Sequence, residues 1–565
     1  MKPQGVGKKE LLVGGLLCVL VILWGCRDIG ICRHPIVYQD EVGYWTNAAV
    51  FAGMDWSGVS DGLVWYSYGY SLLLAPLLLV FPTQELQYQA AVILNAVMLG
   101  ALLLLFRRIL RKLFPSQNTL LLWLPALAGV LYAPYQVYSH TTWAETAVLL
   151  SVTLTGDLLL SLLQKPTFPK TILLGCISSY SFMVHNRCIG VVGAVYPTLV
   201  LAVVLKKLPL RYLLCAAAVL AVGFGIHLAI KAWLTDTLWV TSPPAANDAG
   251  NVLGKLKNVF TSDGAPLWAS LFLSQGMACI GSGACLPLAA ILYLCDRIIR
   301  HGMKREFRTE TFFSLYLVTS FLFMLTISSV FMLTYDRIDQ IIYTRYVDCL
   351  TGLLMAMGIC VLCEKKHRLM PILLLLLPVL LCLWANRAEV LTAHLGTELF
   401  NKLCAPYFDW YYDRFHTVYF AYIFLMGAPI LLCVGIRMLL RNRRRTVCLL
   451  VTAACTGLSM LYAAGGMETI QHQNSIQDMG AQQIRMLKHS MSDEALYIAG
   501  DDGYLPYFAQ LLLQDRRCVA VEKGEDIPEN VLVLCKKEDF AADSGYHVEQ
   551  ETDGYVLFRT SHRSD

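Results

Sequence analysis

The feature that most constrains this chain is a series of apolar runs, each about as long as a helix needs to cross a lipid bilayer. The hydrocarbon core of a bilayer is about 30 Å thick, and a spanning helix needs about 20 mostly apolar residues. Only 15% of the residues are charged, against about 25% in soluble domains. The predicted spans lie near residues 9–26, 88–106, 118–136, 146–163, 170–184, 188–205, 210–232, 266–294, 311–334, 347–363, 369–385, 417–438 and 446–464. These thirteen runs predict an α-helical polytopic membrane protein.

Two segments of this pattern need a separate interpretation. Residues 71–82, "SLLLAPLLLVFP", are too short to span and contain Pro76, which predicts an interfacial or re-entrant piece. The first run follows a basic flank, so a cleaved signal peptide is the alternative to a membrane span. No small-x-small cleavage site follows it, and Trp24 stands where an interfacial aromatic is expected. The sequence therefore favours an uncleaved first span.

The positively charged residues predict which loops face the cytoplasm. Cytoplasmic connections carry an excess of Lys and Arg. The basic connections are residues 8–9, 107–112, 165–170, 206–207, 296–308, 364–368 and 441–445. They alternate without a break with the other connections, so the N-terminus is predicted to be cytoplasmic and the segment after the thirteenth span extracytoplasmic.

The last hundred residues have a different character from the rest. Residues 475–491 predict a helix, and "ALYIAG", "RCVAVE", "NVLVLC" and "YVLFRT" predict strands, with the helix "LPYFAQLLLQ" after the first of them. Strands that alternate with a helix are typical of a small α/β domain. We therefore expect a membrane domain over residues 1–464 and an extracytoplasmic α/β domain over residues 465–565.

The outer loop 27–87 contains an adjacent pair of carboxylates, Asp40 and Glu41. It carries six acidic residues against two arginines and is rich in tryptophan and tyrosine, which favours an ordered loop over a bare linker. A carboxylate in such a loop could act as a general base. A solvated pair without function is the alternative. Adjacent residues on a helix point about 100° apart, so we expect only one of the two, Asp40, to face a substrate.

A second candidate site lies in "YSHTTWAETAVLL", the outer turn between the third and fourth predicted spans. His140 and Glu145 flank this turn. A carboxylate in the first turn of a helix is favourable in itself, so a simple capping role is one interpretation of Glu145. The functional interpretation is that Glu145 faces the same cavity as Asp40, as a substrate contact or as a metal ligand.

Cations on the outer side form a third group of candidates. An arginine at membrane depth is costly and usually functional, and arginine binds phosphate through two parallel hydrogen bonds. The residues concerned are His185, Arg187, Arg337, Arg345 and Tyr346. They predict a phosphate-binding site, with snorkelling to lipid headgroups or pairing with nearby aspartates as the alternatives.

Other signals are weak. Most of the 19 cysteines lie in apolar runs, where they behave as small buried hydrophobic residues. Cys26 with Cys32 and Cys518 with Cys535 could form disulfides in an oxidising compartment, but free thiols are the favoured interpretation. No P-loop, G-x-S-x-G or H-E-x-x-H motif occurs, "GDDGY" is typical of a strand-to-helix turn, and nothing indicates nucleic-acid binding.

Taken in order, these motifs resemble those of the GT-C superfamily of integral-membrane glycosyltransferases. "QDEVGYWTNAAVFAG" is similar to the first-loop motif, "GYSLLLAPLLLVF" to the interfacial segment, and "RYVDCLTGLLMAMG" to the opening of a late span. The nearest branches are the protein O-mannosyltransferases and the bacterial lipid A aminoarabinose transferases, a group related to glycosyltransferase family 39. The resemblance covers about residues 10–464. Some members carry a cation in the interfacial segment, and this chain does not.

The resemblance implies a function and a mechanism. Such enzymes transfer a hexosyl or pentosyl group from a polyprenyl-phosphate carrier on the outer face to a lipid, glycan or protein acceptor. It assigns the base to Asp40 and, more weakly, to Glu41. Arg187, Arg337 and Arg345 would then hold the phosphate. No metal is expected, although a divalent ion shared by Asp40 and Glu145 stays open.

Three other functions remain as alternatives. A transporter or flippase for lipid-linked sugars would need polar residues in the middle of its spans, whereas here they gather at the outer ends. An O-antigen ligase or polymerase would concentrate its functional residues in a late outer loop, whereas here the first loop is the elaborate one. A membrane scaffold would leave the outer Arg and Asp clusters without a role.

Overall fold

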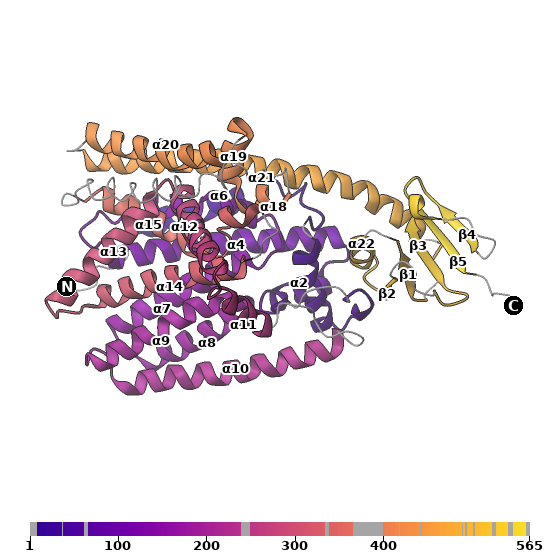
Figure 1. The fold of residues 1–565 in the computed structure, drawn as a ribbon, viewed down its shortest axis with the longest axis horizontal. Coiled ribbons are helices and arrows are strands. Elements are labelled where there is room, and N and C mark those ends of the chain that lie inside the picture. Colours follow the sequence, from indigo (N-terminus) through magenta and orange to yellow (C-terminus); the bar gives the residue numbers. More distant parts are fainter. Residues whose placement is uncertain are drawn as a thin grey trace.

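The computed structural model describes residues 8–36, 38–60, 66–238, 249–333, 338–364, 399–416, 418–440, 443–488, 490–491, 494–500, 503–521, 527–540 and 546–560. Figure 1 shows an elongated molecule with a large helical body and a small sheet at one end, near the C-terminus. The N-terminus lies at the opposite end of the long axis.

The helical body begins with α1 (Lys8–Gly25), α2 (Tyr38–Phe51), α3 (Ser71–Val80), α4 (Gln84–Leu113), α5 (Trp123–Val130), α6 (Ala133–Tyr138), α7 (Glu145–Gln164), α8 (Phe168–Val184), α9 (Ile189–Val204) and α10 (Leu210–Leu238). It continues with α11 (Ala249–Asn258), α12 (Gly264–Ser282), α13 (Leu286–Met303), α14 (Thr309–Phe331), α15 (Asp348–Leu362), α18 (Leu399–Cys404), α19 (Pro406–Phe415), α20 (Val418–Leu439) and α21 (Arg444–Lys488). Short 3-10 turns η1 (Ser57–Val59), η2 (Asn186–Cys188) and η3 (Ile338–Ile342) lie between them.

The apolar helices confirm a multi-pass membrane protein but not the count of thirteen spans. Within the described residues, six helices are long and apolar enough to cross a membrane, or seven if one bent pair is a single span. That pair is α12 and α13, which meet at 109° where one span was predicted over 266–294. The run 118–136 forms two short helices, α5 and α6, and the predicted span 369–385 lies outside the described residues.

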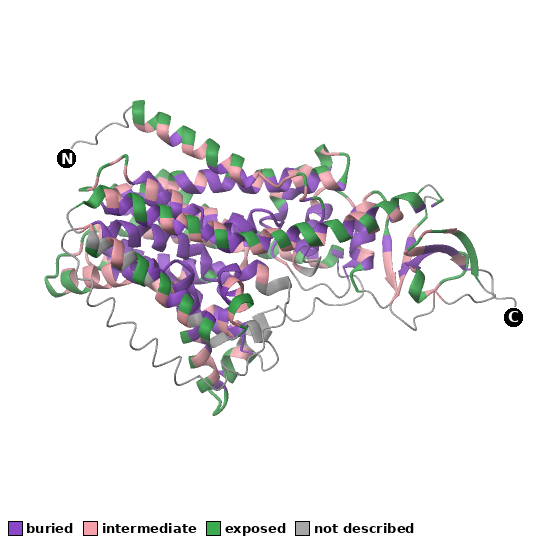
Figure 2. Ribbon diagram, turned by 90° about the horizontal axis from the view of Figure 1, so that it is seen from above, coloured by how far each residue is buried: buried purple, intermediate pink, exposed green. Residues whose placement is uncertain are grey.

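The helices differ in how far the protein itself covers them. The apolar stretch of α7 is 83% buried, whereas that of α10 is only 11% buried. Figure 2 shows the buried residues concentrated through the middle of the helical body. Every residue of α15 is buried. Gly352 of α15 and Gly129 of α5 let these two helices approach closely, because a Cβ at Gly352 would lie only 2.5 Å from the Gly129 carbonyl oxygen. The helix α7 is thus central, and α10 presents most of its apolar surface outward.

The longest helix, α21, links the helical body to the sheet. It runs for 45 residues without a break, so the domain boundary predicted at residue 464 falls inside it. The helix predicted over 475–491 is its outer end. Its buried residues recur every three or four positions along this whole length, which is the period of an amphipathic helix. In Figure 1 it extends as a single rod from the helical body toward the sheet.

The sheet has five strands: β1 (Leu496–Ala499), β2 (Cys518–Val521), β3 (Leu532–Lys536), β4 (Tyr546–Glu551) and β5 (Tyr555–Thr560). Their order is β2-β1-β3-β5-β4, with β1 parallel to β2 and β3, and β5 antiparallel to β3 and β4. The helix α22 (Leu505–Leu512) connects β1 to β2. Four strands match the apolar runs in the sequence. The fifth, β4, was not predicted because nearly all its residues are exposed and no apolar pattern marks it.

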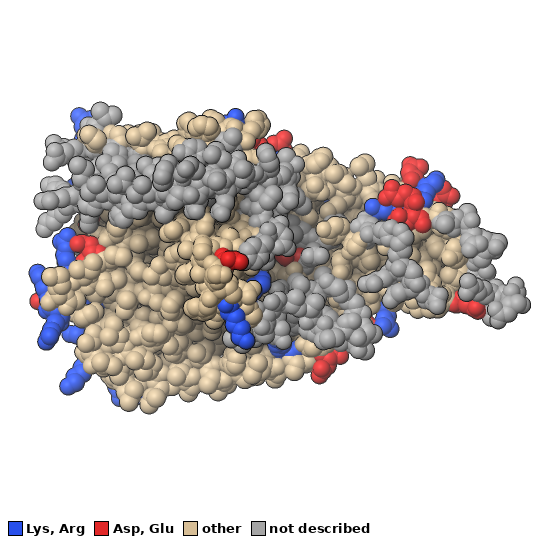
Figure 3. All heavy atoms as spheres, viewed as in Figure 1, with Lys and Arg blue, Asp and Glu red and all other residues tan. Residues whose placement is uncertain are grey.

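The charged side chains are unevenly distributed over the surface. Figure 3 shows Lys and Arg gathered at the end of the helical body far from the sheet, while the middle of the body carries few charges. Within the described residues, Cys26, Cys32, Cys518 and Cys535 form no disulfide.

Candidate active site

The two carboxylates of the first loop lie in the first turn of α2 and point in different directions. The helix begins at Tyr38, so Asp40 and Glu41 lie near its positive N-terminal end, where a carboxylate is favourable. The side chain of Asp40 is 23% exposed, whereas Glu41 is fully buried. Only Asp40 can therefore meet a ligand from outside.

Glu41 anchors α2 to the helices around it. Its Oε1 accepts a hydrogen bond from the backbone N–H of Ile36 at 2.8 Å. Its Oε2 accepts from the Tyr88 hydroxyl at 2.7 Å and from both the N–H and the hydroxyl of Thr142, at 2.7 and 2.6 Å. Bonds to a buried charged group are among the stronger hydrogen bonds in proteins. Glu41 thus connects the start of α2 with α4 and with the turn before α7.

Among the described residues, Asp40 accepts hydrogen bonds from two side chains, Tyr66 and Arg345. Its Oδ1 accepts a hydrogen bond from the Tyr66 hydroxyl at 2.9 Å, and its Oδ2 accepts from Nη1 of Arg345 at 2.5 Å. Gly43, one turn after Asp40, makes the first contact feasible, because a Cβ there would lie 2.1 Å from Cδ2 of the Tyr66 ring. The spacing of Asp40 and Gly43 in "QDEVGYW" therefore lets the Tyr66 ring approach α2 closely and bond to the carboxylate.

Glu145 extends these contacts into a chain of alternating charges. Its Oε1 accepts hydrogen bonds from Nε of Arg345 and, at 3.0 Å, from Nη2 of Arg187. The order is Asp40, Arg345, Glu145, Arg187, with equal numbers of positive and negative groups. These residues come from α2, the segment before α15, α7 and η2, so tertiary folding assembles the site. We call these four residues the charge chain.

Arg187 has two hydrogen-bond donors to spare. Its Nε and Nη1 are buried and, among the described residues, have no hydrogen-bond partner. Its guanidinium also lies over the Tyr346 ring, with the carbon 4.8 Å from the ring centroid. A buried N–H group without a partner is costly, and an anion in front of Arg187 would supply one. Arg345 is held in a similar way over the ring of Trp143, at 4.1 Å.

The two predicted histidines differ in their relation to the charge chain. His185 is next to it: its Nδ1 accepts a hydrogen bond from the Arg187 N–H at 3.3 Å, and its ring meets Tyr346 edge to face. Burial and the positive charge of Arg187 hold the pKa of His185 well below its ordinary value. His140 lies behind Glu41, with Nδ1 2.7 Å from the Gln136 carbonyl oxygen, and burial lowers its pKa to about 4.

The structure therefore gathers most of the predicted site residues in one place. Asp40, Glu145, Arg187 and Arg345 are linked directly, and His185 and Tyr346 pack against them. Glu41 and His140 are fully buried, and the Tyr88 hydroxyl lies within hydrogen-bond distance of both. Arg337 lies outside the described residues.

Several residues shape the site in ways that sequence reasoning missed, including Asp348, which was considered only as an aspartate that could pair with the arginines. Asp348, one turn after Arg345, is buried and accepts hydrogen bonds from Tyr132 at 2.9 Å, Tyr138 at 2.8 Å and Thr344 at 3.3 Å. This network holds the turn that carries Arg345. The three closely spaced tyrosines of "LYAPYQVY" were a signal that polar groups meet in an apolar region. For Tyr66 and Gly43 no comparable signal stands out.

The metal alternative has no ligand cluster to support it in the described part of the chain. There, no group of three His, Cys, Asp or Glu side chains comes close enough to hold an ion. Asp40 and Glu145 do approach a common partner, but this partner is the guanidinium of Arg345.

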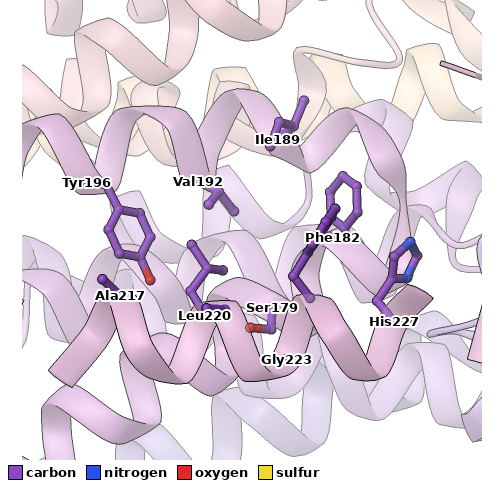
Figure 4. Close-up of a pocket in the computed structure, with 11 residues that line it drawn as sticks. Ser179, Phe182, Ile189, Val192, Tyr196, Ala217, Leu220, Gly223 and His227 are labelled. Atoms are coloured by element: carbon purple, nitrogen blue, oxygen red, sulfur yellow. The ribbon is translucent and has the colours of Figure 1, made fainter. Parts of the chain in front are cut away.

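An apolar cavity of about 290 Å³ opens between α8, α9 and α10. Figure 4 shows its lining, in which Phe182, Ile189 and His227 lie toward one end and Tyr196 and Ala217 toward the other. Ile189 follows Arg187 by two residues, so this end of the cavity lies close along the chain to the charge chain. Its lining is almost entirely apolar, so the cavity is suited to a hydrocarbon chain.

Fold and site together define a multi-pass membrane protein with a chain of alternating charges that is largely buried among its helices. Among solved structures, the chain is similar to ArnT from Cupriavidus metallidurans bound to undecaprenyl phosphate, with 13% identity, a TM-score of 0.50 and 98% of each chain covered. The same enzyme in the apo state gives 14% identity, a TM-score of 0.50 and 97% coverage of each chain. The arabinosyltransferase EmbB from Mycobacterium smegmatis matches 84% of this chain and 42% of its own, at 12% identity and a TM-score of 0.43.

These similarities confirm the fold expected from the sequence, that of the GT-C glycosyltransferases. No family model and no curated protein matches the sequence.

Proposed function

We propose that this protein is a membrane glycosyltransferase that moves a sugar from a polyprenyl-phosphate carrier to an acceptor on the outer face of the membrane. The charge chain is the observation that carries the proposal. It combines a partly exposed carboxylate, which can take a proton, with buried guanidinium groups, which can hold a phosphate.

The donor phosphate is assigned to Arg187 and Arg345. Arg187 has two N–H groups directed at no partner among the described residues, and its position is held by Glu145 and Tyr346. Donors fixed in a buried site stabilise the negative charge that develops on a leaving phosphate. The apolar cavity next to η2 supports a long hydrocarbon tail on the donor. The ArnT structure of the same fold contains undecaprenyl phosphate, which also supports this class of carrier.

The transfer step is assigned to Asp40. An acceptor hydroxyl attacks the anomeric carbon of the sugar while the bond from this carbon to the carrier phosphate breaks. The hydroxyl proton passes to Asp40, and the bonding electrons leave with the phosphate. Such a single displacement inverts the anomeric configuration. Tyr66 holds the Asp40 carboxylate for this step through its hydrogen bond at 2.9 Å.

We assign the site and the sheet domain to the extracytoplasmic side. The basic side chains gather at the opposite end of the helical body (Figure 3), and this end is expected to face the cytoplasm. Polyprenyl-linked sugars presented on the outer leaflet would then reach the arginines from within the membrane.

The test uses the purified full chain and a panel of polyprenyl-phosphate sugars, including hexosyl and pentosyl forms. We expect at least one donor to release free polyprenyl phosphate in step with a new glycoside. Movement of labelled donor across a vesicle membrane without any new glycosidic bond would overturn the proposal and favour a transporter.

A further inference from the structure

The outer end of α21 packs directly against the loop that leads to Asp40. The side chain of Asn474 is buried in this contact, and its Oδ1 accepts hydrogen bonds from two consecutive backbone N–H groups, those of Arg33 at 2.9 Å and His34 at 2.8 Å. Two backbone donors converging on one side-chain oxygen fix the path of the chain at this point more firmly than a contact between side chains would.

His34 continues the same contact. Its ring is fully buried and lies between two acceptors, with Nδ1 2.9 Å from Oε1 of Gln84 and Nε2 2.9 Å from Oδ1 of Asp478. Gln84 in turn donates to the carbonyl oxygen of Arg33 at 2.8 Å. The loop is therefore tied on one side to α21 and on the other to the start of α4.

This contact is continuous with the site. Two residues after His34, the N–H of Ile36 donates to Glu41, whose other oxygen binds Tyr88 and Thr142. Glu41 is the immediate neighbour of Asp40 in the first turn of α2. Asn474 is thus connected to Asp40 through a short stretch of chain and one buried carboxylate.

The sheet domain supports this loop at a second place. The Trp56 indole donates to the Gln514 carbonyl oxygen at 3.4 Å. The side-chain amides of Gln514 and Gln87 donate to each other, and the bond from Gln87 Nε2 to Gln514 Oε1 is 2.9 Å long. Next to them η1 lies so close to β2 that a Cβ on Gly58 would be 2.3 Å from the Cys518 carbonyl oxygen. We call the outer end of α21 together with the sheet domain the tail. Both ends of the segment that carries α2 are therefore held by the tail.

We propose that the tail acts as a clamp that positions Asp40, and that Asn474 is the positioning residue through which it acts. The inference rests on the proposed function, because it concerns the base of that reaction. The donor-binding side depends less on the clamp. Arg187 is held by Glu145 and Tyr346 of the helical body, and Arg345, although it also contacts Asp40, is held by Glu145 and Trp143.

The test compares Asn474→Leu with Asn474→Asp in the full chain. Asn474→Leu has a similar volume but no acceptor, so the loop loses both backbone bonds, while Asn474→Asp keeps an acceptor oxygen. We expect Asn474→Leu to lower kcat about 10- to 100-fold, as small misplacements of a reacting group do. Binding of undecaprenyl phosphate should change by less than about twofold, because Arg187 is untouched. Asn474→Asp should restore most of kcat. Gln482→Ala, at an exposed position of the same helix, is the matched control.

The possible results separate the two proposals. A wild-type protein that transfers no sugar contradicts the proposed function. A wild-type protein that transfers sugar, together with an Asn474→Leu variant of unchanged kcat, overturns the clamp alone. Equal loss of kcat and of undecaprenyl phosphate binding would also overturn it, because this result indicates general misfolding rather than misplacement of Asp40.

Discussion

Arg345 donates a hydrogen bond from Nη1 to Oδ2 of Asp40 at 2.5 Å, and this contact joins the proposed base to a proposed phosphate ligand. Before any substrate binds, the two groups neutralise each other. A donor phosphate that approaches Arg345 competes with Asp40 for the same guanidinium. Donor binding would therefore release the carboxylate to meet the acceptor hydroxyl, which favours an order of binding in which the donor comes first.

The first prediction concerns Asp40 itself. Asp40→Asn keeps the shape of the side chain and can still accept the Tyr66 hydrogen bond, but it cannot take a proton. We expect sugar transfer to fall about 10²- to 10⁴-fold, with binding of undecaprenyl phosphate retained. The measurement is the rate of polyprenyl phosphate release. Asp236→Asn, an exposed carboxylate near the end of α10, should leave this rate unchanged. Normal transfer by Asp40→Asn would remove Asp40 as the base.

The second prediction concerns the donor phosphate. Arg187→Gln removes the two unpartnered donors but leaves Glu145 its bond to Arg345. A lost hydrogen bond to a charged group costs about 1.5 to 3 kcal/mol, so undecaprenyl phosphate should bind roughly 10- to 100-fold more weakly. Calorimetric titration measures this directly. Arg211→Gln, on the exposed start of α10, serves as the control and should bind like the wild type.

The third prediction tests the support of Asp40 by Tyr66. Tyr66→Phe removes only the hydroxyl and should cost about 1 kcal/mol, or roughly fivefold in kcat. Gly43→Ala should cost more, because its Cβ would displace the whole ring from a position 2.1 Å away. In a Tyr66→Ala background the same Gly43→Ala change should have little further effect on kcat. Additive losses in this double-mutant cycle would show that Gly43 acts by another route.

The fourth prediction concerns stability at low pH. Burial lowers the pKa of His140 to about 4, from an ordinary value of about 6.5. Between these two pH values the unfolded chain binds a proton at His140, whereas the folded chain does not. Stability should therefore fall as the pH drops from about 6.5 to about 4. His140→Gln should reduce proton uptake on unfolding near pH 5 by one proton. His34 and His185 also have lowered pKa values, so part of the dependence should remain. The check is the thermal midpoint in detergent as a function of pH. An unchanged slope in the variant would contradict this reasoning.

Sequence reasoning predicted where most of the long apolar helices lie, because a bilayer imposes a local rule on each of them, although the count of thirteen spans is not confirmed. It failed where tertiary packing decides the outcome. The run 266–294 is continuous in hydropathy, yet it bends by 109° after Ser282, where Ala284 and Cys285 take left-handed backbone angles. Sequence reasoning also drew no distinction between α7, which the protein covers, and α10, which it leaves exposed.

At the site, too, sequence reasoning succeeded where a local rule applies and failed where tertiary packing decides. Glu145, Arg187 and Arg345 stand out because charged residues in apolar surroundings are costly and need a reason. Tyr66 and Asn474 do not stand out, because each is an ordinary residue in an ordinary context. Their importance comes from contacts across the fold: Asn474 meets Arg33 from 441 positions away in the chain. No local pattern contains this information.

The unbroken length of α21 also constrains where Asn474 lies. At about 1.5 Å per residue its 45 residues reach roughly 68 Å, more than twice the thickness of the hydrocarbon core. One extra residue between Gly465 and Asn474 would lift Asn474 by about 1.5 Å and turn it by about 100° away from Arg33. The length and phase of this rod are therefore part of the geometry at Asp40, so insertions in α21 should be far less tolerated than most substitutions on its surface.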